Sequence, residues 1–208
     1  MKKIHLLLFS SFILLLSCKK KSADFVIKGL ASDATFSQPL SNAIVKLYQV
    51  PAGSSDEELI SSTTSDAQGN YSFKFPREKM EKYRLVLSKS NYFSIEETIF
   101  FSELSLEKDF IKDVSTTAMS WAKLTFHNLN PADSDHLQYI KQSGKNGCTE
   151  CCPTSYQDYY GSLDTSIYCI NDGDTDYSYF YWAIGTSDQG SRTVFTAAFD
   201  TSEVILNY

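Results

Sequence analysis

The sequence has no excess of basic charge, which a nucleic-acid-binding surface would need. Lysine and arginine number 19 against 25 aspartates and glutamates, so the formal net charge is −6 at pH 7. An acidic surface repels the phosphate backbone. We therefore expect no nucleic acid among the partners of this protein.

The sequence also lacks an apolar run long enough to cross a bilayer. Its most apolar stretch, residues 4–16, follows Lys2 and Lys3 and is shorter than the roughly 20 residues of a spanning helix. Its length suits an export signal. The stretch leads into Leu-Leu-Ser-Cys, ending at Cys18, which resembles bacterial lipoprotein signals that are cut before the Cys. An ordinary secretory signal with an incidental Cys is the alternative.

The lipoprotein resemblance implies a signal peptide over residues 1–17, a diacylated Cys18 and a disordered lipidated tether over residues 18–23. Cleavage removes two of the 19 basic residues and none of the 25 acidic ones, leaving a formal charge of −8. Lys19 directly after the Cys resembles signals compatible with the outer membrane. We expect an envelope lipoprotein held in the membrane by its lipid, with the periplasmic or surface side left open.

Helical spacing of apolar residues is nearly absent, and alternation of apolar and aromatic with polar residues indicates strands. The clearest case is residues 71–75, where three aromatic residues fall on one face and Ser72 and Lys74 on the other. Only residues 77–82 favour a helix. The other strands expected in the first half are residues 25–30, 43–50, 83–88 and 93–101. Seven are expected in the second half: residues 121–128, 136–141, 156–160, 166–170, 179–184, 192–199 and 204–208.

Two motifs in the first half point to a known type of sandwich. Pro-Leu-x-x-Ala-x-Val begins at Pro39, and Asp-x-x-Gly-x-Tyr-x-Phe begins at Asp66. In the second motif the Asp can accept backbone N–H bonds within a turn that Gly69 closes at positive φ. Together the motifs resemble carboxypeptidase regulatory-like domains over residues 24–115. That resemblance implies a noncatalytic, transthyretin-like β-sandwich that serves as a spacer or interaction module.

The second half, residues 118–208, matches no family that we recognise. Seven short strands separated by turn signals favour an immunoglobulin-like sandwich. The 208 residues, less the signal, leave room for two domains. The expected fold class is therefore all-β, with two tandem β-sandwiches, transthyretin-like and then immunoglobulin-like.

After Cys18 the first half of the chain contains no cysteine, and the other four all lie in the second half. Cys148, Cys151, Cys152 and Cys169 would lie outside the cytoplasm, where two disulfides are expected. A Cys151–Cys152 bond would need a strained ring and is the least favoured pairing. Cys169 should then join the cluster formed by the other three. Zinc is the alternative, since Cys148 and Cys151 have the spacing of metal ligands.

Three carboxylates at alternate positions, Asp172, Asp174 and Asp176, could converge on a calcium ion as in the first half of a calcium loop. The loop pattern is incomplete because Tyr177 stands where a Gly is required. A plain acidic turn between two strands is the favoured interpretation. Neither calcium nor zinc is therefore expected as a cofactor.

The aromatic run around Tyr179, Tyr181 and Trp182 could stack on sugar rings or anchor a partner protein. In the alternative interpretation, Phe180 and Trp182 pack inside and the tyrosines line the outer face. Alternation requires one of the two faces to be core.

No Gly-rich phosphate loop, Ser-His-Asp set or pair of catalytic carboxylates can be assigned. We therefore expect a noncatalytic spacer or binding module for an envelope protein or a glycan. The alternative is a hydrolase or metal-dependent enzyme with its site in the Cys-rich half, although neither His127 nor His136 has the local signature of a Cys–His protease.

Overall fold

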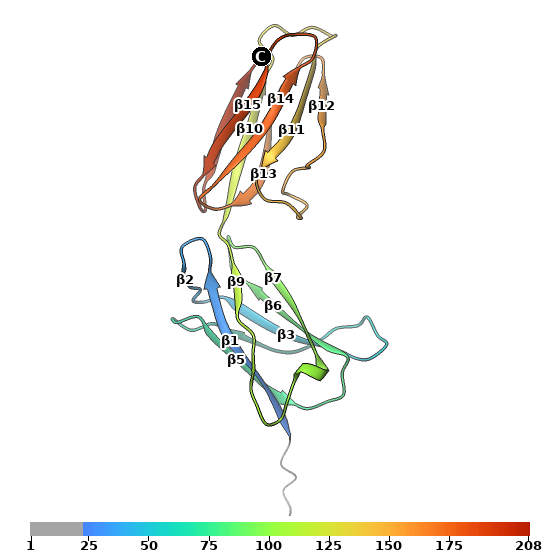
Figure 1. The fold of residues 1–208 in the computed structure, drawn as a ribbon, viewed down its shortest axis with the longest axis vertical. Helices are drawn as coiled ribbons and strands as arrows, with labels where there is room; N and C mark the ends of the chain where they lie inside the picture. Colours follow the sequence, from blue (N-terminus) through green and yellow to red (C-terminus); the bar gives the residue numbers. More distant parts are fainter. Residues whose placement is uncertain (1–22) are drawn as a thin grey trace, which may run out of the picture.

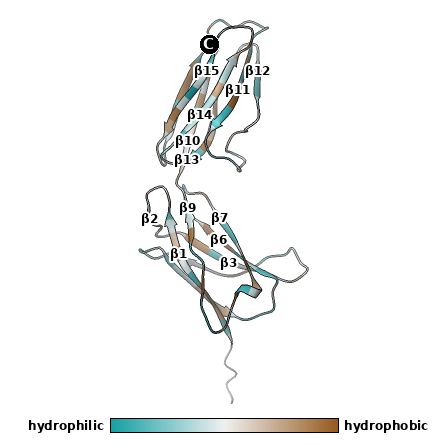
Figure 2. Cartoon of the chain, viewed as in Figure 1, coloured by the Kyte–Doolittle hydropathy of each residue, from teal (hydrophilic) through white to brown (hydrophobic). Residues whose placement is uncertain are grey.

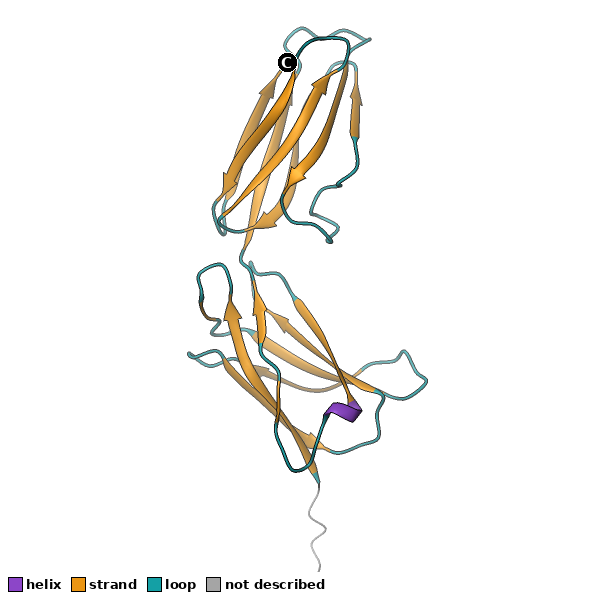
Figure 3. Ribbon diagram, in the orientation of Figure 1, coloured by secondary structure: helices purple, strands orange, loops and turns teal. Residues whose placement is uncertain are grey.

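The computed structural model describes residues 23–208, so the predicted signal peptide, Cys18 and nearly all of the tether lie outside the described residues. The described part contains sixteen strands and one short 3₁₀ helix, η1 (Phe101–Glu103), drawn purple in Figure 3. No helix within it is long and apolar enough to span a membrane. The prediction of a nearly all-β chain is confirmed.

The N-terminal half consists of two sheets around one core. β1 is the centre of the first sheet, with β2 and β5 antiparallel to it and β8 and β9 parallel. The second sheet has the order β4-β3-β6-β7. The bounds are β1 (Asp24–Asp33), β2 (Gln38–Pro39), β3 (Ile44–Val50), β4 (Glu58–Thr64), β5 (Asn70–Pro76), β6 (Lys82–Ser88), β7 (Ile95–Phe100), β8 (Phe110–Ile111) and β9 (Val114–Thr116).

The local predictions for this half hold where the hydrophobic pattern is strong. Tyr71, Phe73 and Phe75 all point into the core. Gly69 has a φ of 80°, and Asp66 Oδ1 accepts the backbone N–H groups of Gln68 and Asn70 at 2.9 and 2.8 Å. The motif that begins at Asp66 is thus a turn leading into a buried strand.

The helix predicted over residues 77–82 is wrong. Residues 77–81 form a connection, and Lys82 already belongs to β6. The ends of this connection are tied to neighbouring segments, because the Arg77 N–H donates to the Ala23 carbonyl and the Glu81 N–H to the Val50 carbonyl. In a helix over residues 77–82 the Glu81 N–H would donate to the Arg77 carbonyl, and the bond to Val50 replaces that helical bond.

The C-terminal half repeats the two-layer arrangement around a second, separate core (Figure 2). One sheet has the order β13-β10-β16 and the other the order β12-β11-β14-β15. All seven predicted strands are present. Their bounds are β10 (Met119–His127), β11 (His136–Ser143), β12 (Gln157–Tyr160), β13 (Asp164–Asp172), β14 (Thr175–Ala183), β15 (Gln189–Thr196) and β16 (Thr201–Asn207).

Strand order shows that the second sandwich is not immunoglobulin-like. In an immunoglobulin constant domain the first strand shares its sheet with the second, fourth and fifth. Here β10 pairs antiparallel with β13 and parallel with β16, just as β1 pairs with β5 and β9. β11 pairs with β12 and β14, as β3 pairs with β4 and β6. Both halves therefore share one topology. The strand count could not reveal it, because it does not specify which strands become neighbours.

Only two residues, Thr117 and Ala118, separate β9 from β10. Ala118 is fully buried within the N-terminal core. Its N–H donates to Thr35 Oγ1 at 2.9 Å, and its carbonyl accepts the Gly173 N–H at 2.7 Å. A Cβ at Gly173 would lie 2.7 Å from the Ala198 Cβ. The turn can therefore approach the junction this closely only with glycine at this position.

Aromatic rings close the junction on one side. The Phe199 ring centroid lies 5.3 Å from that of Tyr92 and 5.9 Å from that of Phe36. These contacts join the loop before β16 to the N-terminal half. The result is the extended arrangement in Figure 1, with the start of β1 and the C-terminus at opposite ends.

Replacing Phe199 with Ala should loosen the junction while leaving both cores intact. Phe195→Ala is a matched control, because Phe195 is exposed on the same half (56%) and lies in β15 instead of at the junction. Residual dipolar couplings from both halves should fit one alignment tensor in the parent and the control. Two distinct tensors are expected for Phe199→Ala; a single shared tensor would contradict this account of the junction.

Candidate functional site

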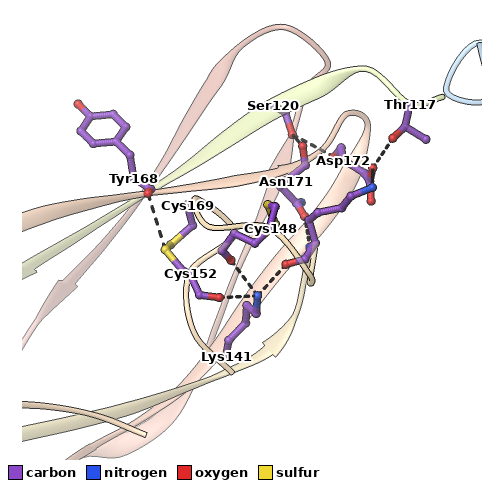
Figure 4. The surroundings of a disulfide bond; sticks show 11 residues. Thr117, Ser120, Lys141, Cys148, Cys152, Tyr168, Cys169, Asn171 and Asp172 are labelled. Atoms are coloured by element: carbon purple, nitrogen blue, oxygen red, sulfur yellow. Dashed lines mark hydrogen bonds and ion pairs between the residues drawn. A yellow bond between two sulfur atoms is a disulfide. The ribbon is translucent and has the colours of Figure 1, made fainter. Parts of the chain in front are cut away.

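The four cysteines that were predicted to form disulfides do so, as Cys148–Cys151 and Cys152–Cys169. The first closes a tight loop, and the second ties this loop to β13, so the predicted link between Cys169 and the cluster is confirmed. Figure 4 shows the loop lying against the end of β11. Because the four sulfurs are bonded to one another, they serve neither as zinc ligands nor as a thiolate nucleophile.

A buried lysine fixes the backbone of this disulfide-bonded loop. Lys141 lies on the inner face of β11 and is 7% exposed. Its Nζ donates to the carbonyls of Lys145, Cys151 and Cys152 at 2.7, 2.8 and 2.9 Å (Figure 4). Burial lowers the pKa of Lys141. All three ammonium protons are committed to the loop, so this lysine has a structural role.

The three carboxylates considered for calcium do not converge. Asp172 Oδ1 accepts from Lys145 Nζ at 2.8 Å and from the Thr117 hydroxyl. Asp174 Oδ1 accepts the Ala198 N–H at 2.9 Å. No group of three His, Cys, Asp or Glu side chains within residues 23–208 could hold a metal. Asp176 lies in β14. Residues 172–175 form a tight connection from β13 to β14, and this connection is part of the junction.

Lys145 links the disulfide-bonded loop to both halves. Its ammonium pairs with Asp172, and it also lies 4.1 Å from the ring centroid of Phe93 in the N-terminal half. Its backbone N–H donates to Asn171 Oδ1 at 2.7 Å. The loop and the acidic turn, two of the three features that could have formed a recognition surface, therefore lie at the junction.

The third feature is the aromatic strand β14, where only Trp182 of the three predicted binding residues points outwards, and where the alternative with Phe180 and Trp182 inside is wrong. Tyr179 and Tyr181 are 0% and 2% exposed and point into the core, so neither can belong to an exposed platform. Phe180 and Trp182 point outwards and are half-buried. The tyrosines of β14 can point inwards partly because two of their hydroxyls find hydrogen-bond partners there. Tyr181 donates to Asp188 Oδ1 at 2.7 Å, and Tyr177 donates to the Cys169 sulfur. Alternation alone could not distinguish the two faces.

The outward side chains of the sheet β12-β11-β14-β15 form what we call the aromatic face. At one end of it the Trp182 ring lies 5.9 Å from Tyr156 and 4.5 Å from Phe180. At the other end the Tyr160 and His136 rings stack at 4.3 Å. Tyr156 and Tyr160 are 56% and 70% exposed. The face therefore offers aromatic surface at these two places, and Phe195, which points outwards from β15 and is 56% exposed, adds a third.

A polar cluster lies between these two aromatic ends. His136 Nε2 and Gln138 Nε2 lie 2.7 and 2.9 Å from the same atom, Asp158 Oδ1. Hydrogen bonds from His136 first, and then from Gln138, lower the pKa of Asp158. Asp158 is thus an ionised acceptor at neutral pH.

The strands of the aromatic face carry no outward cation. Even-numbered residues of β11, β12 and β14 and odd-numbered residues of β15 point outwards, and none of them is Lys or Arg. Their polar groups are hydroxyls, amides, one imidazole and the carboxylates of Asp158 and Asp176. The face is therefore neutral to acidic.

One hollow lies on the N-terminal half, and a second adjoins the aromatic face at His136. The first has a volume of about 550 Å³ and includes Asp66 and Tyr71. Two of its polar side chains are engaged elsewhere: Asp66 in its own turn, and the Tyr71 hydroxyl with the Lys112 carbonyl. Burial raises the pKa of Tyr71.

The second hollow, of about 240 Å³, is at the distal end and includes His136. Thr186 lines the same hollow but donates its hydroxyl to the Ala183 carbonyl at 2.8 Å. His136 itself is bonded to Asp158. This hollow therefore shows no Thr-His pair poised for nucleophilic attack.

No protein-family model and no curated protein match the chain. Among solved structures it is similar to the Bacillus anthracis TIE protein (12% identity, 88% of this chain and 34% of that one, TM-score 0.38). It is also similar to a streptococcal ancillary pilin (11%, 90% and 63%, 0.38) and to shaft pilin SpaA of Lactobacillus rhamnosus GG (8%, 88% and 97%, 0.36). The chain thus spans about a third of the first of these proteins. The carboxypeptidase regulatory-like assignment stays a prediction.

The orientation of β14 predicts opposite effects for two conservative substitutions. The buried Tyr179 hydroxyl has no hydrogen-bond partner within residues 23–208, so Tyr179→Phe should leave the free energy of unfolding unchanged or raise it. Tyr181→Phe loses its bonds to Asp188 and Arg192 and should lower this free energy by about 1 kcal/mol. Urea denaturation measures both. Equal destabilisation by the two variants would contradict the assignment.

Proposed function

We propose that this protein is a noncatalytic, lipid-anchored envelope protein, with its N-terminal half as spacer and its C-terminal half as binding module. The observation that carries this proposal is the aromatic face, where large aromatic side chains remain exposed on a rigid sheet. Exposed aromatic residues on a rigid scaffold are typical anchors for a partner.

The position of the N-terminal end supports the assignment of the N-terminal half as spacer and the C-terminal half as binding module. β1 starts at the end of the N-terminal half that lies away from the junction (Figure 1). A lipid on Cys18, a few residues before β1, would attach this end to the membrane. The aromatic face would then be held away from the bilayer. Lys19 after the Cys favours the outer membrane as its location.

The chemistry of the C-terminal half supports a binding role over catalysis. The four cysteines are bonded in pairs, the Lys141 ammonium is committed to carbonyls, and Asp172 is engaged at the junction. The groups that would have supplied a nucleophile, a Schiff-base amine or a metal ligand thus have structural partners. The aromatic face is left as the surface for a binding role.

The anchor predicts a simple change in partitioning. Cys18→Ser removes the acceptor of the lipid, so the variant should move from the detergent phase to the aqueous phase in a Triton X-114 separation of whole cells. Lys19→Ser is the matched control and should stay in the detergent phase. Retention of Cys18→Ser in the detergent phase would show that no lipid on this residue holds the protein.

The binding role predicts that capture of a partner depends on the aromatic face. Photo-crosslinking in intact cells with the full-length chain should give discrete adducts that disappear with Tyr156→Ala or Trp182→Ala. Tyr168→Ala is the matched control, because Tyr168 is as exposed as Tyr156 (58% against 56%) but lies in the other sheet. Adducts that persist in both face variants, or that vanish only with Tyr168→Ala, would place the binding surface elsewhere.

A further inference from the structure

We infer that the ligand of the aromatic face is an extended, uncharged oligosaccharide. The inference rests on the proposed binding role of this face and adds the chemical class of the ligand. It uses three observations: the spacing of the exposed aromatic side chains, the polar row between them and the absence of cations.

Tyr156 and Tyr160 form two aromatic stations at the β12 edge of the sheet. Tyr160 is the last residue of β12, and Tyr156 lies directly before its first residue, so four residues separate the stations by roughly 13 Å at most, at about 3.3 Å per residue. Trp182 adjoins the first station and His136 the second. A pyranose ring presents an apolar face of C–H groups, which packs flat on an aromatic ring. Two stations this far apart suit a chain of sugars better than a single sugar.

The row between the stations offers partners for sugar hydroxyls. The strand register places Gln138 opposite Asp158 on one side and Trp182 on the other. A carboxylate and an amide thus lie side by side on neighbouring strands, about 4.8 Å apart, and the next residue of this row, Trp182, has its ring beside the first station. Carboxylates accept hydroxyl protons, and amides both donate and accept. This row matches the hydroxyl-bearing edge of a sugar.

Charge distinguishes an uncharged glycan from the other candidates. Phosphate, sulfate and uronate groups are recognised by Arg and Lys, and no outward strand position of this face carries either. The centre of a protein interface is usually depleted of charge and continuously packed. Here an ionised Asp158 hydrogen-bonded to His136 and Gln138 separates the two aromatic stations. An uncharged ligand rich in hydroxyl groups fits this pattern better than an apolar protein surface.

The chain contains two tryptophans, so Trp121→Phe in the full mature chain leaves Trp182 as the only fluorescent indole. The probes are three uncharged hexasaccharides, from cellulose, mannan and chitin, and one anionic hexasaccharide of galacturonic acid. At least one uncharged probe should shift Trp182 emission saturably. In this background Tyr156→Ala and Tyr160→Ala should each weaken binding about tenfold, a loss typical of an anchor residue. Tyr168→Ala should change it less than about twofold.

Both tyrosines are mostly exposed, so removing them leaves the core intact, and an unchanged melting temperature verifies this. If no uncharged probe binds, or the galacturonate hexamer binds best, the glycan inference is wrong. If crosslinked partners still depend on Tyr156 and Trp182 in that case, the proposed binding role stands without it. Sugar binding that is insensitive to both tyrosine substitutions would also overturn the inference. If neither crosslinking nor sugar binding depends on the face, both proposals fail.

Discussion

The rest of the structure depends on the passage of the chain through Ala118. With two residues between β9 and β10, the facing ends of the two sandwiches must pack together, and every polar group there needs a partner. The Gly173 N–H donates a hydrogen bond to the Ala118 carbonyl, and the Thr117 hydroxyl donates one to Asp172. The acidic turn is therefore committed to the junction, and Lys145 brings the disulfide-bonded loop to the same place.

This commitment determines which surfaces stay available. The most conspicuous features of the second half in the sequence, the cysteine cluster and the Asp172 to Asp176 segment, have internal partners. The outer face of β12-β11-β14-β15 takes no part in the junction, and its aromatic side chains remain exposed. Binding would then use a sheet face held by a rigid scaffold, at a distance from the anchored end of the chain.

Features that depend on a short stretch of sequence could be predicted from the sequence. Strong alternation located the strands, Asp66 and Gly69 located a turn, and cysteine spacing located the disulfide link to Cys169. Long-range partners decided the rest. β4 was missed because its polar residues 61–64 give no apolar alternation. The inward turn of Tyr179 depends on the partners and packing of the neighbouring tyrosines, and the order of the strands depends on edges distant in sequence.

Hydrogen–deuterium exchange of the full mature chain, with and without its bound partner or sugar, tests the central claim most directly. The claim is that the junction is structural and the aromatic face is the binding surface. It predicts new protection confined to residues 136–142, 156–160 and 178–184, with residues 144–152 and 172–176 already slow to exchange and unchanged. New protection of the disulfide-bonded loop or the acidic turn, with an unchanged aromatic face, would contradict it.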